Sequence, residues 1–106
     1  MKNKAVSLIQ FAFKARKVVL GDALIPSIQK TTAKLVLIST KCGQNRKKKL
    51  KDKCTFYNVP WLEVEPELFD QISHRSFNSL AICEDGFAKA IMEEMKIVKQ
   101  LLKGMS

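Results

Sequence analysis

Cysteine, histidine and clustered glycine are scarce in this chain, and their scarcity excludes several kinds of site. The three cysteines, Cys42, Cys54 and Cys83, are odd in number and far apart, and His74 is the only histidine. A structural zinc site needs about four closely spaced nitrogen or sulfur ligands, so we expect no bound metal and free thiols in a reducing compartment. The four glycines stand singly, which excludes a glycine-rich phosphate loop.

Long apolar runs are also missing. No segment approaches the roughly 18 consecutive apolar residues of a membrane span. The apolar stretch from Ala5 to Phe13 is interrupted by Gln10, is followed by basic residues and lacks a small-residue cleavage site. It therefore predicts an amphipathic first helix rather than a signal peptide. We expect a cytoplasmic protein without membrane contact.

Motifs for catalysis are equally sparse. The chain has no Gly-x-Ser-x-Gly elbow, and His74 has only three serines within five positions along the chain. Such spacing does not by itself make a catalytic triad, which is defined by geometry. Glu63, Glu65 and Glu67 alternate as in a solvated strand face, without a metal-binding partner. We expect a protein that is not an enzyme and has no cofactor, and an enzyme that uses His74 stays an alternative.

Positive charge, in contrast, is abundant and unevenly placed. The 106 residues include 19 Lys and Arg against 10 Asp and Glu, for a net charge of +9. Residues 1–53 hold 14 basic and 2 acidic residues, a net +12, whereas residues 54–106 hold 5 and 8, a net −3. A small domain with such a basic and lopsided charge predicts a polyanionic partner, above all a nucleic acid.

Helical and strand patterns alternate from end to end. Apolar periodicity predicts helices over 4–16, 23–30, 45–57, 66–73 and 87–103, and short apolar runs predict strands over 17–20, 34–39, 61–64 and 80–83. Asp22 is the expected N-cap of the second helix. Alternation with short connections predicts a single domain over 1–106, an α/β fold with three α/β/α layers around a mixed sheet of about four strands. The pattern leaves the strand order open.

The densest basic segment spans residues 46–53. Lys48, Lys49 and Lys51 are expected on the helix face opposite the buried stripe. Ammonium groups there would lie along phosphates and make binding depend on salt. The alternative is a solvated helix face whose long stems cover apolar surface.

A second basic cluster, Lys14, Arg16 and Lys17, precedes the helix start at Gly21 and Asp22. A helix start offers free N–H groups to phosphate or base-edge acceptors, and a glycine lets a backbone approach closely. The alternative is an ordinary turn from strand to helix.

A third basic segment consists of His74, Arg75, Ser76 and Phe77. A polar, basic loop with one aromatic ring can hold a phosphate and stack a splayed base. The alternative is that Phe77 packs in the core.

Five segments carry a resemblance to a known family. They are residues 11–21, similar to an opening Leu-Ala-x-Arg-Ala-Gly-Lys-Leu-Val-x-Gly, the central strand 33–39, and the later blocks 45–54, 57–60 and 85–89. In this order they resemble the bacterial YlxQ-type proteins of the L7Ae/L30e ribosomal protein superfamily. The resemblance implies the α/β/α sandwich and binding of kink-turn RNA, often within ribosomes or other ribonucleoproteins.

The resemblance also implies where RNA would be held. By position, these places are the corner at residues 17–23, Thr40 and Lys41 after the second strand, and the segment 74–77 before the last strand. The family's kink-turn motif is Gly-x-Asn-Glu followed by a helix lysine. This chain departs from it, because Gly21-Asp22 is followed by Ala23 and Leu24, with Pro26 and Ser27 near the lysine position.

These observations lead to one prediction and one main alternative. We expect a monomeric, non-catalytic domain that binds structured RNA, with ribosomal proteins as further partners. The alternative is a protein–protein interaction module that kept the fold and lost kink-turn selectivity, because the Asn-Glu pair is missing. The candidate RNA-binding residues are Lys14, Arg16, Lys17, Gly21, Asp22, Ala23, Thr40, Lys41, Lys48, His74, Arg75, Ser76 and Phe77.

Overall fold

The computed structural model describes residues 4–72 and 78–104, with side chains up to Met95. Its helices are α1 (Lys4–Lys14), α2 (Leu24–Gln29), α3 (Gln44–Phe56), α4 (Pro66–Ile72) and α5 (Asp85–Gly104). Its strands are β1 (Val18–Val19), β2 (Leu35–Ser39), β3 (Trp61–Val64) and β4 (Ser79–Ile82), and a 3-10 turn, η1 (Gly21–Ala23), precedes α2. Every predicted helix and strand is present, and each bound lies within two residues of its prediction.

The four strands form one mixed sheet in the order β1-β4-β2-β3. β4 runs antiparallel to both of its neighbours, whereas β2 and β3 are parallel. The two central strands, β2 and β4, are buried along their whole length. The mixed sheet is confirmed, and the structure supplies the order that periodicity left open.

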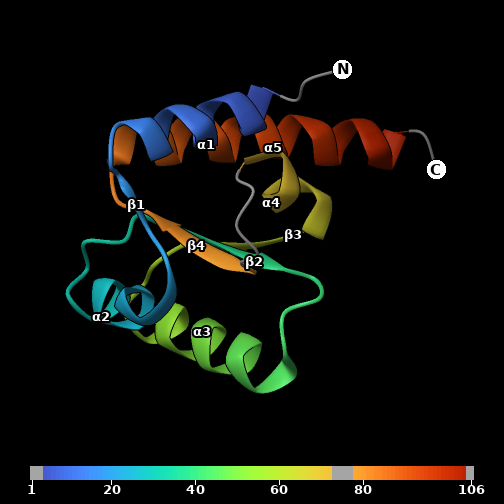
Figure 1. Ribbon diagram of the computed structural model, residues 1–106. Coiled ribbons are helices and arrows are strands. Elements are labelled where there is room, and N and C mark those ends of the chain that lie inside the picture. The colour runs from blue at the N-terminus through green and yellow to red at the C-terminus, as the bar shows by residue number, and fades with distance from the viewer. Residues whose placement is uncertain (1–3, 73–77, 105–106) are drawn as a thin grey trace.

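Helices cover both faces of this sheet (Figure 1), with α1, α4 and α5 on one face and α2 and α3 on the other. Along β2, Leu35 and Leu37 pack toward the first layer, while Val36 and Ile38 pack toward the second. Successive side chains of a strand point to opposite faces, which explains why an unbroken apolar run was needed here. The predicted three-layer sandwich is confirmed.

Three helices end in the same left-handed backbone turn. Arg16, Thr31 and Asn58 have φ angles of 59°, 58° and 57°. After α1, the Lys17 N–H donates to the Ala12 carbonyl at 2.9 Å and the Arg16 N–H to the Phe13 carbonyl at 3.1 Å. This pair of bonds defines the Schellman motif, whose left-handed residue is most often glycine. The same pair of bonds ends α2 and α3.

The start of α2 differs from its prediction. Asp22 lies inside η1, and the residue that caps α2 is Ala23, with no side-chain hydrogen bond to the cap. The prediction that Asp22 caps the helix is wrong, because the tight turn after Gly21, at φ 63°, begins the helical path earlier. Pro26 is the third residue of α2, where the missing N–H has no partner within the helix.

Among the helices in the described part of the chain, none is both long and apolar enough to cross a membrane.

Candidate nucleic-acid interface

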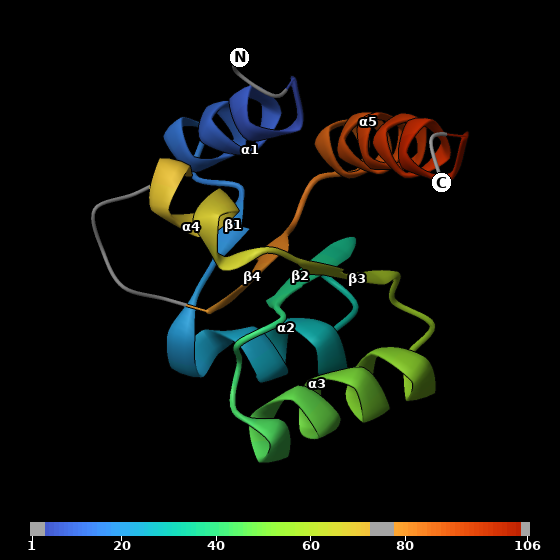
Figure 2. The same cartoon turned by 90° about the vertical axis from the view of Figure 1, so that its right-hand side faces the viewer.

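Segments far apart in the sequence meet beside the start of α3. Arg46 donates from Nη2 to the Gly21 carbonyl at 3.4 Å, and Lys47 donates from Nζ to the Thr40 carbonyl at 2.9 Å. In Figure 2 the connection after β2 descends to the start of α3, with η1 and α2 beside it. We call this surface the η1 edge. Its residues are Gly21, Asp22, Ala23, Thr40, Lys41, Arg46 and Lys47.

The first part of the η1 edge is the turn that follows β1. Gly21 takes a φ of 63°, and a Cβ built on it meets nothing within 4 Å. Glycine is therefore favoured here by the backbone angle and not by lack of space. Gly21, Asp22 and Ala23 are all exposed. The Gly21 carbonyl accepts from both the Leu24 N–H and Arg46, which ties the turn to α2 and α3.

The second part is the connection from β2 to α3. The buried Ser39 accepts the Lys41 N–H on Oγ at 3.1 Å and the Cys42 N–H on its carbonyl at 3.0 Å. This tight turn buries the Cys42 side chain and leaves Thr40 and Lys41 exposed. The structure thus places Thr40 and Lys41 on the same surface as Gly21, Asp22 and Ala23, as the resemblance implied.

The third part is the start of α3, and from there the lysine run continues along the helix and divides into two groups. Lys48 and Lys49 are exposed, as predicted. Lys51 was expected on the same outer face, and that prediction is wrong. It is half-buried, contacts the carboxylate of Glu63 on β3, and holds its ammonium 4.8 Å from the centre of the Trp61 ring.

Glu63 lies on an exposed face, as predicted, and its carboxylate also pairs with two lysines of α3. It accepts a hydrogen bond from Lys51, and its other oxygen lies 3.8 Å from Lys47 Nζ. The hydrogen bond from Lys51 lowers the pKa of Glu63, partial desolvation opposes this effect, and the charges of Lys47 and Lys51 add to it. Glu63 thus offsets part of the charge of the run, and the exposed positive charge comes from Lys48 and Lys49.

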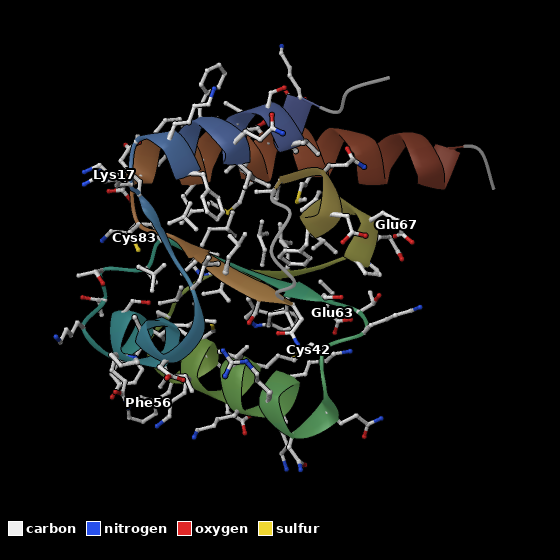
Figure 3. All side chains as sticks on the ribbon, in the orientation of Figure 1. Lys17, Cys42, Phe56, Glu63, Glu67 and Cys83 are labelled. Carbon is white, nitrogen blue, oxygen red and sulfur yellow. The ribbon has the colours of Figure 1, made fainter. Side chains whose placement is uncertain are left out.

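The basic cluster of Lys14, Arg16 and Lys17 is not part of the η1 edge. These residues lie before β1, whereas η1 follows it, and an extended chain from Lys17 to Gly21 spans up to about 13 Å. Figure 3 shows Lys17 beside Cys83, whose N–H donates to the Lys17 carbonyl at 2.7 Å. The structure therefore places this cluster at the other end of β1, although all three side chains are exposed.

Cys83 is half-buried at that other end. Burial raises the pKa of its thiol, and the charges of Lys34 and Lys17 partly oppose this effect. Cys54, fully buried on the inner side of α3, has a pKa raised to about 11 by burial. All three thiols are free. Within residues 4–72 and 78–95, no three Cys, His, Asp or Glu side chains gather as metal ligands would.

The third predicted basic segment, His74, Arg75, Ser76 and Phe77, lies outside the described residues. Asn78, which follows it, is exposed and accepts the Ser39 N–H on its carbonyl at 2.8 Å. Asn78 therefore lies beside the strand end from which Thr40 and Lys41 extend.

Two η1-edge residues, Arg46 and Lys47, were missed among the candidates, and of these Arg46 contacts η1 itself. The sequence marked it as the first residue of the lysine run, and Lys48 was chosen as the contact from that run. A usable signal was its place in the first turn of the helix that follows a buried strand. Such a turn lies at the end of the sheet, whereas residues further along the helix move away from it.

Residues 3–92 match the model of the Ribosomal protein L7Ae/L30e/S12e/Gadd45 family. The chain belongs to this family. The match covers α1 to the first turns of α5, so it includes every strand and the whole η1 edge.

Individual relatives support the assignment to the L7Ae family. The chain is 35% identical over 94 residues to RNA-binding protein YlxQ from Enterococcus faecium, covering 87% of this chain and 91% of the relative. It is 38% identical over 88 residues to RNA-binding protein YlxQ from Bacillus subtilis (strain 168), covering 80% and 88%. A solved structure of a protein of unknown function from Bacillus halodurans C superimposes with a TM-score of 0.83 at 26% identity, covering 90% of this chain and 99% of that chain. The sequence-based resemblance is thus confirmed.

The departures from the L7Ae-family motifs now have a structural meaning. Leu24, at the motif's Glu position, is fully buried, and Ala23, at its Asn position, is exposed but has no polar side-chain atom. Side-chain reading of bases from these two positions is therefore absent. Arg16, at the glycine of the opening motif, keeps the left-handed turn that ends α1.

Proposed function

We propose that this protein is a non-catalytic RNA-binding protein that holds structured, kink-turn-like RNA on the η1 edge. The observation that carries the proposal is the basic junction of exposed Thr40 and Lys41 and half-buried Arg46 with η1 in an L7Ae-family chain. Two relatives at 35% and 38% identity are named RNA-binding proteins.

The proposed contacts fall into two classes. Lys41, Arg46 and Lys48 neutralise phosphates, while the backbone of η1 approaches the RNA where Gly21 leaves room. Asp22 accepts hydrogen bonds and repels phosphates, so we place it against base or sugar hydroxyl donors. His74, Arg75, Ser76 and Phe77 are kept as proposed RNA contacts on the ground of their place in the sequence.

The missing Asn and Glu side chains set the kind of selectivity. With Ala23 and a buried Leu24 in their places, recognition rests on the shape of the RNA and on phosphates, which fix position without reading bases. Residues 1–106 form one RNA-binding domain in this proposal, monomeric, cytoplasmic and associated with ribosomes and their proteins.

Binding to a kink-turn duplex and to a straight duplex of equal length, across a range of salt, tests the proposal. We expect tighter binding to the kink-turn and a steep fall of affinity with salt for both RNAs. Equal affinity for both would remove the kink-turn preference and leave a phosphate-driven RNA binder. Binding of neither RNA at low salt would overturn the proposal.

A protein–protein interaction module is the second candidate, favoured by the loss of polar side chains at Ala23 and Leu24. It predicts a protein partner whose binding tolerates salt, and RNA binding no tighter than that of any basic protein of equal charge. A matched pair of charge variants separates the two candidate functions. Lys41→Gln should weaken RNA binding, whereas Lys89→Gln, at an exposed position of α5, should not.

A further inference from the structure

A basic stripe runs along α3 from the η1 edge to an exposed aromatic ring. Arg46, Lys49, Lys53 and Phe56 follow one another at spacings of three and four residues, so they share one flank of the helix. At 1.5 Å per residue, Arg46 and Phe56 are separated by about 15 Å along the helix axis. We call these four residues the α3 stripe.

Of the three charged residues of the α3 stripe, Lys49 is exposed, whereas Arg46 and Lys53 are half-buried. The opposite flank of α3, with Lys47 and Lys51, is occupied by Glu63 and Trp61. Among the ion pairs of the described residues, none includes Lys49 or Lys53. Asp52, the one acidic residue of α3, is exposed next to the stripe. The stripe therefore offers two ammonium groups beyond Arg46.

Phe56 ends the α3 stripe with an open ring. It is 78% exposed, compared with 58% for Phe11 on α1. The Tyr57 ring pairs with it in a T-shaped arrangement, with centres 4.9 Å apart and planes at 71°, so one neighbour steadies a ring that is largely open to solvent. Figure 3 shows Phe56 at the outer side of the α2–α3 layer, away from the sheet.

We propose that the α3 stripe is a second RNA contact, along which a single strand leaving the η1 edge runs to stack an unpaired base on Phe56. This inference rests on the proposed function. Ammonium groups spaced along a helix match phosphates, and an open aromatic ring stacks any base regardless of sequence. One ring beside two lysines is too small and too charged for an apolar protein interface, so charge complementarity favours RNA as the occupant.

The test compares a structured RNA with the same RNA carrying a short single-stranded uridine tail. Wild-type protein should bind the tailed RNA more tightly. Phe56→Ala should lower the affinity for the tailed RNA by about fivefold or more, which is the lower end of the range for one stacked base. Phe56→Trp should keep the wild-type affinity for the tailed RNA. Phe11→Ala, the matched change at the other exposed phenylalanine, should leave both affinities unchanged. Lys49→Gln and Lys53→Gln should each lower the salt slope by about 1 for the tailed RNA only.

The outcomes separate this inference from the proposed function. If wild-type protein binds the tailless RNA and Phe56→Ala keeps the full gain from the tail, the inference is overturned while the proposed function stands. If wild-type protein binds neither RNA, both are overturned. A Phe56-dependent dimer in sedimentation, with no effect of the tail, would assign the ring to a second copy and overturn the inference. Because Phe56 is exposed, its variants should keep the wild-type circular dichroism.

Discussion

Arg16, Thr31 and Asn58 hold the same backbone conformation at very different cost. A left-handed conformation costs an L-residue roughly 1–2 kcal/mol, and asparagine tolerates it better than most. Threonine is β-branched and is an outlier at a positive φ. The three helix ends are therefore strained in the order Thr31, Arg16 and Asn58, with Thr31 the most strained.

Thr31→Gly should stabilise the fold by about 1 kcal/mol, because relief of the left-handed strain exceeds the entropy cost of glycine. The Thr31 side chain is exposed and donates to the neighbouring Lys30 carbonyl, so little contact is lost. Urea unfolding measures the gain. Asn58→Gly is the control and should change stability by only a few tenths of a kcal/mol, and a Thr31→Gly variant no more stable than wild type would contradict the account.

Glu63 should make stability depend on acid pH. Its pKa in the folded state is lowered, first by the hydrogen bond from Lys51, so its ionised form favours folding. This contribution is fully present well above its ordinary pKa of 4.5 and is lost as the pH falls through the lowered value. Glu63→Gln should flatten the acid limb of the urea midpoint plotted against pH. An unchanged limb in Glu63→Gln would assign the acid sensitivity to other carboxylates.

At the scale of elements, α3 combines a strongly polar sequence with little burial. Only Leu50 and Cys54 are buried among its 13 residues, and its lysines repel one another. Helices of this kind gain most of their stability from tertiary packing. The position of the whole lysine run therefore depends on two side chains.

Leu50→Ala should cost about 2–5 kcal/mol in the free energy of unfolding, because it leaves a cavity under a helix with little other anchorage. Lys49→Ala, one position away and exposed, should stay within about 0.5 kcal/mol of wild type. Thermal or urea unfolding of the two variants measures the contrast. Similar losses in both would show that α3 is not held by its buried stripe.

The helices and strands were predictable because apolar periodicity and helix- or strand-ending residues report local conformational preference directly. The same reasoning failed where a contact distant in the sequence, or a backbone angle, determines the position of a side chain. Lys51 lies 100° from Leu50 around the helix, and only the position of Glu63 and Trp61 shows which side it takes. Asp22 failed as a cap because the backbone angle of Gly21, invisible in the pattern, starts the turn one residue earlier.

At the scale of the molecule, the strand order separates residues that the sequence places together. Lys17 and Gly21 are four positions apart, but β1 puts them at opposite ends of the sheet, whereas Gly21 and Arg46 are 25 positions apart and in contact. The sequence-based prediction placed the Lys17 cluster and the Gly21 turn in one site because the two are close in the sequence. Thr40 and Lys41 directly follow one strand, so their position at the end of the sheet could be predicted from the sequence, whereas their contact with RNA stays a prediction.

Two charge variants should therefore behave differently on RNA. A Lys14→Gln/Lys17→Gln variant should weaken binding to kink-turn and straight duplexes equally, because it alters only the general attraction. A Lys41→Gln/Arg46→Gln variant removes equal charge at the η1 edge and should reduce the preference for the kink-turn. Titrations at two salt concentrations measure both effects, and an equal loss of preference in the two variants would refute the separation.

The place of β4 between β1 and β2 has a consequence for how the chain is made. During translation the first two strands and the half of the chain with net charge +12 emerge long before residues 79–82, which join them into one sheet. Closing that long-range pairing is the slow step for such topologies. The nascent chain therefore presents its basic half before the sheet can close, next to the RNA of the ribosome that is making it, until β4 has left the exit tunnel.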